Sequence, residues 1–240
     1  MNAFTNEGRP DLAQKFIDLV NREVNGGNVG GLEDWMAETV PRVRAGAADQ
    51  VLDKAAELTE LDRLSREIGH DPQLSARFNP GVSSGKSFDI LIERTTNRVP
   101  AVERRVEVER MKNLPVAASG LNGPALHGAD KAVTPTPGRI PTAETTVVIP
   151  TPPKGGYTLP LGGGNERRFD ANGLDYEIVD PNGNVKSSGS FLADLARSFD
   201  KNQQMHPNLP NLDAVNIVDD KGNLLGRINR GSTGWTQEPG

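Results

Sequence analysis

The sequence has no cysteine, which excludes disulfide bonds, cysteine-ligated zinc sites and a thiol nucleophile. Histidine is nearly as scarce: His70, His127 and His206 lie too far apart for a histidine-rich metal site and leave room only for a single catalytic histidine. Aromatic residues form 5% and hydrophobic residues 35% of the 240 residues, whereas there are 26 glycines and 18 prolines. This composition predicts a modest core with long connections.

The chain also lacks a net positive charge. The net charge of −5 gives no overall positive field that would attract nucleic acid, so any basic groove has to be local. No hydrophobic run approaches the length of a membrane span, and the N-terminal MNAFTNEGRP lacks the basic and apolar parts of a signal peptide. We therefore expect a soluble protein whose export would depend on something outside this sequence.

The spacing of apolar residues divides the chain into a helical first third and a mixed remainder. Helical spacing predicts three helices, over 11–24, 32–43 and 47–68. Alternation and turn signals predict the later elements: a strand pair over 88–92 and 104–110, a short helix ending at 132, a strand over 145–149, a hairpin over 176–186, a helix over 191–199 and a hairpin over 214–228. Proline and glycine between 133 and 170 predict loops. The predicted fold class is α+β with an α/β core, comprising an N-terminal helical segment (1–46) and one domain (47–240).

Three carboxylates on the predicted strand pair are the most informative feature. Glu107 and Glu109 are two residues apart on a strand, so both side chains project from one face, while the neighbouring valines project toward the core. Asp89 lies at the start of the preceding strand, and pairing of the strands would bring the three carboxylates together. An oxygen-preferring divalent cation, Mg²⁺ or Mn²⁺, would relieve their repulsion. The alternative is a solvated strand face whose glutamates pair with nearby arginines.

These residues and the order of elements around them resemble the PD-(D/E)xK nuclease superfamily. The matched residues are Asp89 in SFDILIE and Glu107 and Glu109 in RRVEVER, and the resemblance spans roughly residues 47–230. It implies a restriction-endonuclease-like mixed sheet flanked by helices, with β-hairpins at the C-terminus. It also implies metal-dependent phosphodiester hydrolysis, in which the three carboxylates bind the metal and take part in catalysis.

The superfamily most often has lysine where the second glutamate stands in this chain. The resemblance implies that another lysine orients the attacking water, and Lys131 on the following helix or Lys112 is available for this role. An acidic residue on the preceding helix often completes such sites. Glu57, Glu60 and Glu67 are available, and we expect Glu67 to be the additional metal ligand.

Basic residues surround the expected metal site and are predicted to bind the nucleic-acid backbone. Arg104, Arg105, Arg110 and Lys112 form the densest positive cluster of the chain, and Lys86 lies close to the aspartate in sequence. Basic side chains commonly position phosphates beside the reacting bond. The alternative interpretation is that they neutralise glutamates on an exposed sheet face.

The whole chain also resembles the C-terminal toxin domains of bacterial polymorphic or contact-dependent inhibition toxins, in which a helical entry segment precedes a nuclease core. The last third, ending in NLDAVNIVDDKGNLLGRINRGSTGWTQ, adds to this resemblance. The resemblance implies export from a bacterium and action in the cytoplasm of a target cell, with DNA ahead of RNA (such as tRNA) as the substrate. It also implies a cognate immunity protein as a partner.

Two other functions are open on the sequence alone. ADP-ribosyltransferase toxins also carry Glu-x-Glu, and Arg77, Ser83-Ser84 and Glu107-Val-Glu109 follow the order of the Arg–Ser–Glu triad of that family, at compressed distances. The second is a non-catalytic acidic interaction protein or immunity-type protein whose carboxylates bind a partner. Cleavage that requires a metal would distinguish the nuclease from both.

Overall fold

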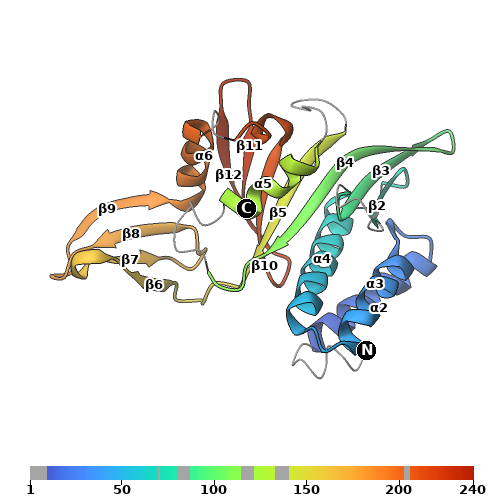
Figure 1. The fold of residues 1–240 in the computed structure, drawn as a ribbon, viewed down its shortest axis with the longest axis horizontal. Helices are drawn as coiled ribbons and strands as arrows, with labels where there is room; N and C mark the ends of the chain where they lie inside the picture. The colour runs from blue at the N-terminus through green and yellow to red at the C-terminus, as the bar shows by residue number, and fades with distance from the viewer. Residues whose placement is uncertain (1–9, 70, 80–86, 115–121, 133–140, 203–205) are drawn as a thin grey trace.

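The computed structural model describes residues 10–69, 71–79, 87–114, 122–132, 141–202 and 206–240, and it confirms the predicted α+β class (Figure 1). The described α-helices are α2 (Pro10–Val24), α3 (Leu32–Arg44), α4 (Ala48–Glu67), α5 (Asn122–Lys131) and α6 (Phe191–Asn202), and the short 3-10 helices are η2 (Gly162–Gly164) and η3 (Leu209–Asn211). The three helices predicted for the first third match α2, α3 and α4 closely. Among the described residues, no helix combines the length and the apolar character needed to cross a membrane.

A mixed sheet of eight strands forms the centre of the molecule. Its strands are, in spatial order, β1 (Val29–Gly30), β2 (Leu74–Phe78), β3 (Ile90–Thr96), β4 (Val99–Arg110), β5 (Thr142–Ile149), β10 (Ala214–Asp219), β11 (Leu224–Arg230) and β12 (Trp235–Pro239). The pairs β1–β2, β4–β5 and β5–β10 are parallel and the others are antiparallel. The predicted strand pair is the β3–β4 hairpin, and the predicted C-terminal hairpin is β10–β11.

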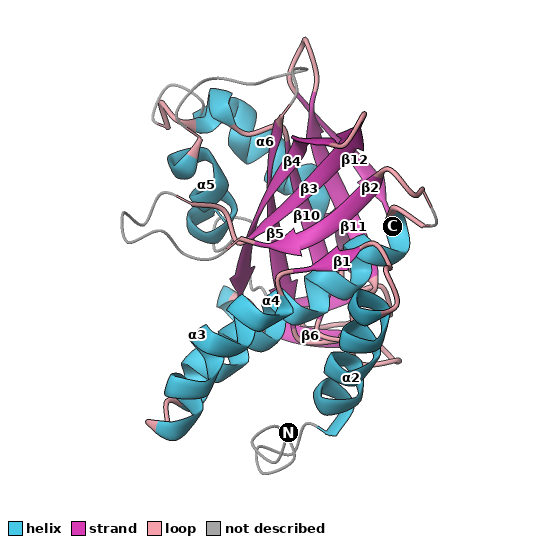
Figure 2. Ribbon diagram, turned by 90° about the vertical axis from the view of Figure 1, so that its right-hand side faces the viewer, coloured by secondary structure: helices cyan, strands magenta, loops and turns pink. Residues whose placement is uncertain are grey.

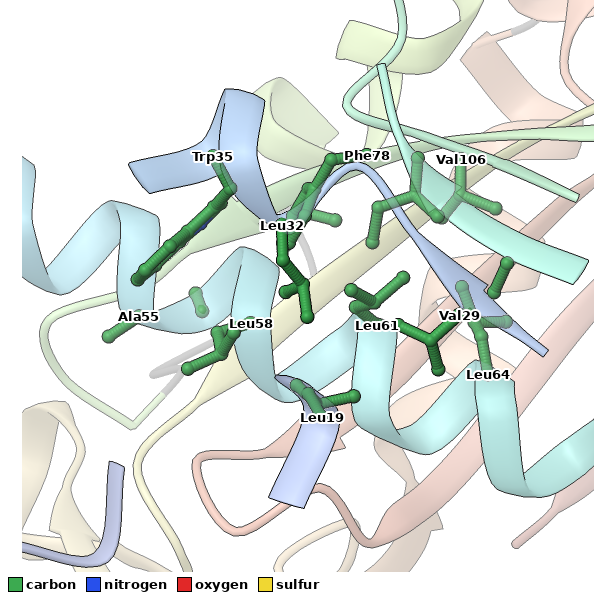
Figure 3. Close-up of a cluster of buried hydrophobic side chains, with 14 of the residues drawn as sticks. Leu19, Val29, Leu32, Trp35, Ala55, Leu58, Leu61, Leu64, Phe78 and Val106 are labelled. Carbon is green, nitrogen blue, oxygen red and sulfur yellow. The ribbon is translucent and has the colours of Figure 1, made fainter. Parts of the chain in front are cut away.

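Helices α2, α3 and α4 cover one face of this sheet. Figure 3 shows their apolar side chains, such as Leu58 and Leu61 of α4, in one cluster with Val106 of β4. The Trp35 ring stacks on Phe78 of β2 with ring centroids 5.8 Å apart. These large side chains remove much apolar surface from water where they meet the strands. The N-terminal helices and the sheet therefore form one common core. The division of the chain at residue 46 remains a prediction.

Helices α5 and α6 lie against the opposite face of the sheet (Figure 2). The apolar stripe of α6, including Phe191 and Phe199, packs with Ile217 of β10 in a second hydrophobic cluster. On β5, Val147 belongs to this second cluster while Val148 belongs to the first. A strand that is buried on both faces needs apolar residues at successive positions, which explains the continuous TTVVI run of β5.

A second, antiparallel sheet of four strands partly occupies the region that was predicted to form loops. Its strands are β6 (Tyr157–Pro160), β7 (Glu166–Phe169), β8 (Asp175–Val179) and β9 (Val185–Ser190). The prediction of loops up to residue 170 was therefore wrong for β6 and β7. Tyr157 stacks on Phe169 across these two strands with centroids 4.4 Å apart. Glycines flank these short strands. At Gly156 (φ 75°), a Cβ atom would lie 2.0 Å from the Phe169 carbonyl oxygen, so only glycine fits there.

Candidate active site

The β3–β4 hairpin places Asp89 beside Glu107. The register pairs Ile90 with Val106, and continued by one residue it puts Asp89 opposite Glu107. The backbone N–H of Val108 donates a hydrogen bond to Oδ2 of Asp89 at 2.9 Å. Val106 and Val108 are buried in the cluster beneath α4. By the two-residue period of a strand, Glu107 projects toward the other face of the sheet, where α5 lies.

Glu107 is buried, with 3% of its surface exposed. The Nζ atom of Lys131, from the last turn of α5, lies 2.5 Å from its Oε1 atom. Its Oε2 atom is also shielded from solvent and receives no hydrogen bond from the described residues. A solvated strand face would leave such a glutamate exposed and hydrated. The burial of Glu107 therefore favours a specific role for this carboxylate over the solvated-strand alternative.

The carboxyl groups of Asp89 and Glu107 perturb each other. Burial and the negative charge of Asp89 raise the pKa of Glu107 to about 9, although Lys131 acts in the opposite direction. Burial also raises the pKa of Asp89, against the lowering effects of Lys131 and of the Val108 amide. The Lys131 ammonium group thus acts on both carboxylates, Lys54 also acts on Asp89, and a further cation nearby would stabilise the ionised forms of both.

Helix α4 contributes Glu57 to the same region. Glu57 and Asp89 line one small cavity, together with Lys54 and Glu38. Burial, followed by the charge of Asp89, raises the pKa of Glu57 to about 7. Lys54 Nζ lies 2.9 Å from Oε2 of Glu57 and 2.6 Å from Oε2 of Glu38, so this ammonium group partly balances one carboxylate of α4 and one of α3.

Glu67, the residue expected to complete the metal site, is placed elsewhere. Its carboxylate lies 2.7 Å from Nη1 of Arg63 and 2.5 Å from Nη1 of Arg104. Ten residues separate it from Glu57, which is about 15 Å along a helix axis. The structure therefore brings Glu57, and not Glu67, toward Asp89, and it holds Glu67 in an ion-pair network.

Glu109 faces α5 together with Glu107. Its Oε1 atom contacts Nδ1 of His127, which lies four residues before Lys131 and hence on the same side of the helix. Glu107, Glu109 and His127 each offer one ligand atom, and the three atoms lie within 4.8 Å of one another. These three side chains could therefore hold a metal ion.

The close approach of α5 to the sheet depends on Gly128. A Cβ atom at this position would lie 2.6 Å from Oγ1 of Thr145 on β5 and 3.0 Å from the carbonyl oxygen of Glu144. The Gly128 N–H instead donates a hydrogen bond to Thr145 Oγ1 at 3.2 Å. Because glycine has no side chain, α5 can lie against β5 at a distance that lets its neighbours His127 and Lys131 reach the strand carboxylates.

The expected nucleic-acid-binding residues divide between the two faces. Three of them lie in ion pairs on the α4 side or next to it: Arg104 with Glu144 and Glu67, Arg110 with Asp53 and Asp49, and Lys112 with Asp49. The interpretation that these cations neutralise nearby carboxylates thus describes their contacts, although their partners are on α4 and β5 and are not Glu107 or Glu109.

Arg105 has the same strand parity as Glu107 and faces the α5 side. Its guanidinium lies over the Phe88 ring, 5.1 Å from the centroid, and its Nε atom is buried without a hydrogen-bond acceptor among the described residues. Burial lowers the pKa of Arg105, with Asp213 acting in the opposite direction. Lys86 lies outside the described residues. Arg105 is therefore the expected phosphate-binding residue that the fold places on the site's face.

The residues of the transferase alternative are not gathered in the described part of the chain. Arg77 lies on β2, 3.5 Å from Glu93 of β3 through its Nη1 atom, and β3 separates β2 from the Glu-x-Glu strand. Ser83 and Ser84 lie outside the described residues. The transferase function stays a prediction, and the placement of Arg77 gives it no support.

Lys54 is the site residue that sequence reasoning missed altogether, and Glu57 is one that it ranked too low. The signal was the Lys54–Glu57 spacing of three residues, which places both side chains on one side of α4. Comparisons with known proteins do not add to this picture: no protein-family model, no curated protein and no solved structure matches the chain. The function has to be argued from the geometry of the site.

Proposed function

We propose that this protein is a metal-dependent nuclease that hydrolyses phosphodiester bonds. The observation that carries the proposal is the convergence of Asp89, Glu107 and Lys131 from three separate elements, with Glu107 buried and in contact with the lysine. A buried carboxylate with a second, partly buried carboxylate beside it and a lysine in contact is an unfavourable arrangement for stability alone. It is the arrangement needed to bind a divalent cation next to a group that handles a proton or a phosphate oxygen.

The oxygen donors of Asp89 and Glu107 fit Mg²⁺ or Mn²⁺, both of which prefer carboxylate ligands. When bound, such an ion lowers the pKa of a water molecule and stabilises negative charge on the phosphate. The ammonium group of Lys131 favours the ionised form of Glu107 and retains N–H groups that can donate to an attacking water or to a phosphate oxygen. The Val108 N–H fixes the orientation of the Asp89 carboxylate.

The substrate would be held through its backbone near the α5 face. Arg105 supplies positive charge on this face, since it lies two residues before Glu107 with the same strand parity. The overall charge of −5 does not attract nucleic acid from a distance, so binding would depend on a few local contacts. Such contacts read phosphates, with DNA proposed ahead of RNA as the substrate.

The biological role is proposed from the resemblance of the whole chain to bacterial toxin domains. In that role the protein is exported from a bacterium, cleaves nucleic acid in the cytoplasm of a target cell and is neutralised by a cognate immunity protein. The site gives this role a physical basis, because a partner that carries cationic side chains could cover Glu109 and His127, which remain partly exposed.

The proposal is tested by incubating the purified protein with plasmid DNA and with tRNA in the presence of Mg²⁺ or Mn²⁺. We expect cleavage that stops with a chelator and with Glu107→Ala, and that persists in Glu177→Gln, which removes an exposed charge on β8 in the second sheet. Consumption of nicotinamide dinucleotide without added metal would instead support the transferase function. If both assays are negative with protein freed of any co-purifying partner, the proposal is wrong, and a stable partner would then favour an interaction protein.

A further inference from the structure

The pairing of His127 with Glu109 is not used by the proposed hydrolysis. Asp89, Glu107 and Lys131 are sufficient for a metal ion and a proton-handling group, yet α5 also directs an imidazole at the second glutamate of the strand. About half of the His127 side chain is exposed, so hydrophobic packing does not account for its position. The contact therefore calls for a separate explanation.

The two oxygens of Glu107 have different surroundings. Oε1 lies 2.5 Å from Nζ of Lys131, whereas Oε2 is buried and receives no hydrogen bond from the described residues. The side chain as a whole is 5% exposed. A buried acceptor without a donor costs free energy, which a bound cation would recover. Ligand atoms of Glu107, Glu109 and His127 lie within 4.8 Å of one another, which is close enough for one ion to contact all three after small side-chain adjustments.

The donor set indicates the class of metal. Carboxylates alone suit Mg²⁺ and Ca²⁺, but a neutral imidazole nitrogen favours the first-row transition metals. Without cysteine, the chain offers no thiolate that would select zinc or copper through sulfur. Two carboxylates and one imidazole, with the exposed side left for water, match a dication such as Mn²⁺.

We propose that Glu107, Glu109 and His127 form a binding position for a transition-metal dication, separate from the position between Asp89 and Glu107, with Glu107 shared by the two. This inference rests on the proposed function in that it adds a second ion to the same site. A pair of ions that share a carboxylate can stabilise both the attacking and the leaving oxygen of a phosphodiester. The binding itself, however, does not require turnover and can be measured without a substrate.

The test uses the purified full chain and Mn²⁺ alone. Pulsed electron paramagnetic resonance detects the nitrogen of an imidazole bound directly to Mn²⁺, and we expect this nitrogen signal in the wild type. His127→Ala should abolish the signal and weaken the binding of one Mn²⁺ by about tenfold or more, while Mg²⁺ affinity changes little. His206→Ala, which removes a histidine that is not part of the Glu107–Glu109–His127 group, is the matched control and should retain the signal.

Two results would overturn the inference. One is a wild-type spectrum without a nitrogen signal at saturating Mn²⁺; the other is a His127→Ala variant that binds Mn²⁺ as the wild type does. Because His127 is half-exposed, its replacement should leave thermal unfolding of the metal-free protein unchanged, which separates loss of a ligand from loss of the fold. A second variant, Glu109→Gln, should also weaken Mn²⁺ binding and leaves the histidine in place.

The result for Mn²⁺ binding at His127 and the result for nucleic-acid cleavage can be told apart. If the nitrogen signal depends on His127 but no nucleic acid is cleaved with any metal, the metal position stands and the nuclease proposal fails. If nucleic acid is cleaved with Mg²⁺ and the His127→Ala variant binds Mn²⁺ normally, the nuclease proposal stands and the second position is wrong.

Discussion

Both faces of β4 carry charged residues, but the surroundings of these residues differ between the faces. On the α4 side, Arg104 is paired with Glu144 at 2.9 Å and with Glu67 at 2.5 Å, and Arg110 is paired with Asp53 at 2.8 Å. On the α5 side, Glu107 is buried next to Asp89 with one oxygen lacking a hydrogen bond from the described residues. Neighbouring residues of one strand are thus fully paired on one face and incompletely paired on the other.

The buried carboxylates beneath α4 have hydrogen-bond and ion-pair partners that compensate their charge. Glu60, fully buried, accepts two hydrogen bonds from Arg63 and a third from Thr146, at 2.7 Å each. Burial would raise the pKa of Glu144, but Arg104 and Arg227 outweigh it and hold the pKa below the usual value. The pKa of Glu107 moves in the other direction, to about 9. The candidate site therefore differs from the network beneath α4 because its negative charge is not balanced by neighbouring cations.

The largest effect on stability is expected on the α4 face. Replacing Arg104 with Met leaves the buried carboxylate of Glu144 without its main partner, which should cost about 3–5 kcal/mol of unfolding free energy. Denaturant unfolding measures this loss. Cleavage per folded molecule should remain close to that of the wild type, and a specific loss of activity in a fully folded variant would break the proposed division between the faces.

Lys131 should show the opposite behaviour. Lys131→Ala removes the ammonium group beside Glu107 and should lower the rate of cleavage about 10²- to 10³-fold. Its effect on unfolding should be smaller than that of Arg104→Met, because the raised pKa of Glu107 lets this carboxyl take up a proton once the ammonium group is gone. Lys131→Arg should recover part of the rate because the positive charge is kept. The measurement is single-turnover cleavage, with Lys201→Ala on α6 as the control; equal losses in the two variants would remove Lys131 from the site.

Two substitutions that each remove one negative charge, Glu107→Gln and Glu144→Gln, test whether negative charge is in excess on the α5 face only. A carboxyl group whose pKa is raised by folding stabilises the protein below its ordinary pKa, and this stability is lost as the pH rises through the folded value, here about 9 for Glu107. In metal-free protein above neutral pH, Glu107→Gln should therefore raise the unfolding free energy by about 1 kcal/mol. Glu144→Gln should lower it, because the pKa of that group is depressed.

These two variants should be compared by denaturant unfolding over a range of pH, with and without Mg²⁺. Added metal should stabilise the wild type at neutral pH and should have little effect on Glu107→Gln. If both variants destabilise the protein to a similar degree, the carboxylate of Glu107 is satisfied in the metal-free state and the contrast between the two faces disappears.

The smallest expected effect concerns substrate binding. Arg105→Ala should weaken binding of nucleic acid a few-fold and reduce the slope of log affinity against log salt concentration by about 1, the contribution of one phosphate contact. Arg110→Ala, on the opposite face, should leave this slope unchanged. Fluorescence anisotropy at several salt concentrations, without metal, measures both; a larger effect of Arg110 would place the substrate on the α4 side.

Strong periodicity made part of this structure predictable. The helices of the first third, the β3–β4 hairpin and the shared face of Glu107 and Glu109 follow from spacing alone. Strands β6 and β7 escaped prediction because each has only four residues between glycines and prolines, and their order comes from cross-strand stacking, as between Tyr157 and Phe169. Strand β2 is short as well and becomes recognisable only when it pairs with β3.

The choice among the glutamates of α4 could not be made from the sequence. Glu57 and Glu60 are both buried, so the usual rule that charged residues mark the exposed side of a helix fails here. Which glutamate approaches Asp89 depends on where α4 crosses the sheet. The approach of His127 and Lys131 likewise depends on a tertiary contact, the packing of Gly128 on Thr145, which leaves only a glycine as its trace in the sequence.

The Asp89–Glu107 pair is proposed to bind a divalent cation for phosphodiester hydrolysis. The most direct test is cleavage of plasmid DNA and tRNA by metal-stripped wild type and Asp89→Asn, before and after Mg²⁺ or Mn²⁺ is restored. Metal should restore cleavage in the wild type and leave the variant about 10³-fold slower. Cleavage by Asp89→Asn at the wild-type rate, or cleavage that survives removal of the metal, would contradict this proposal.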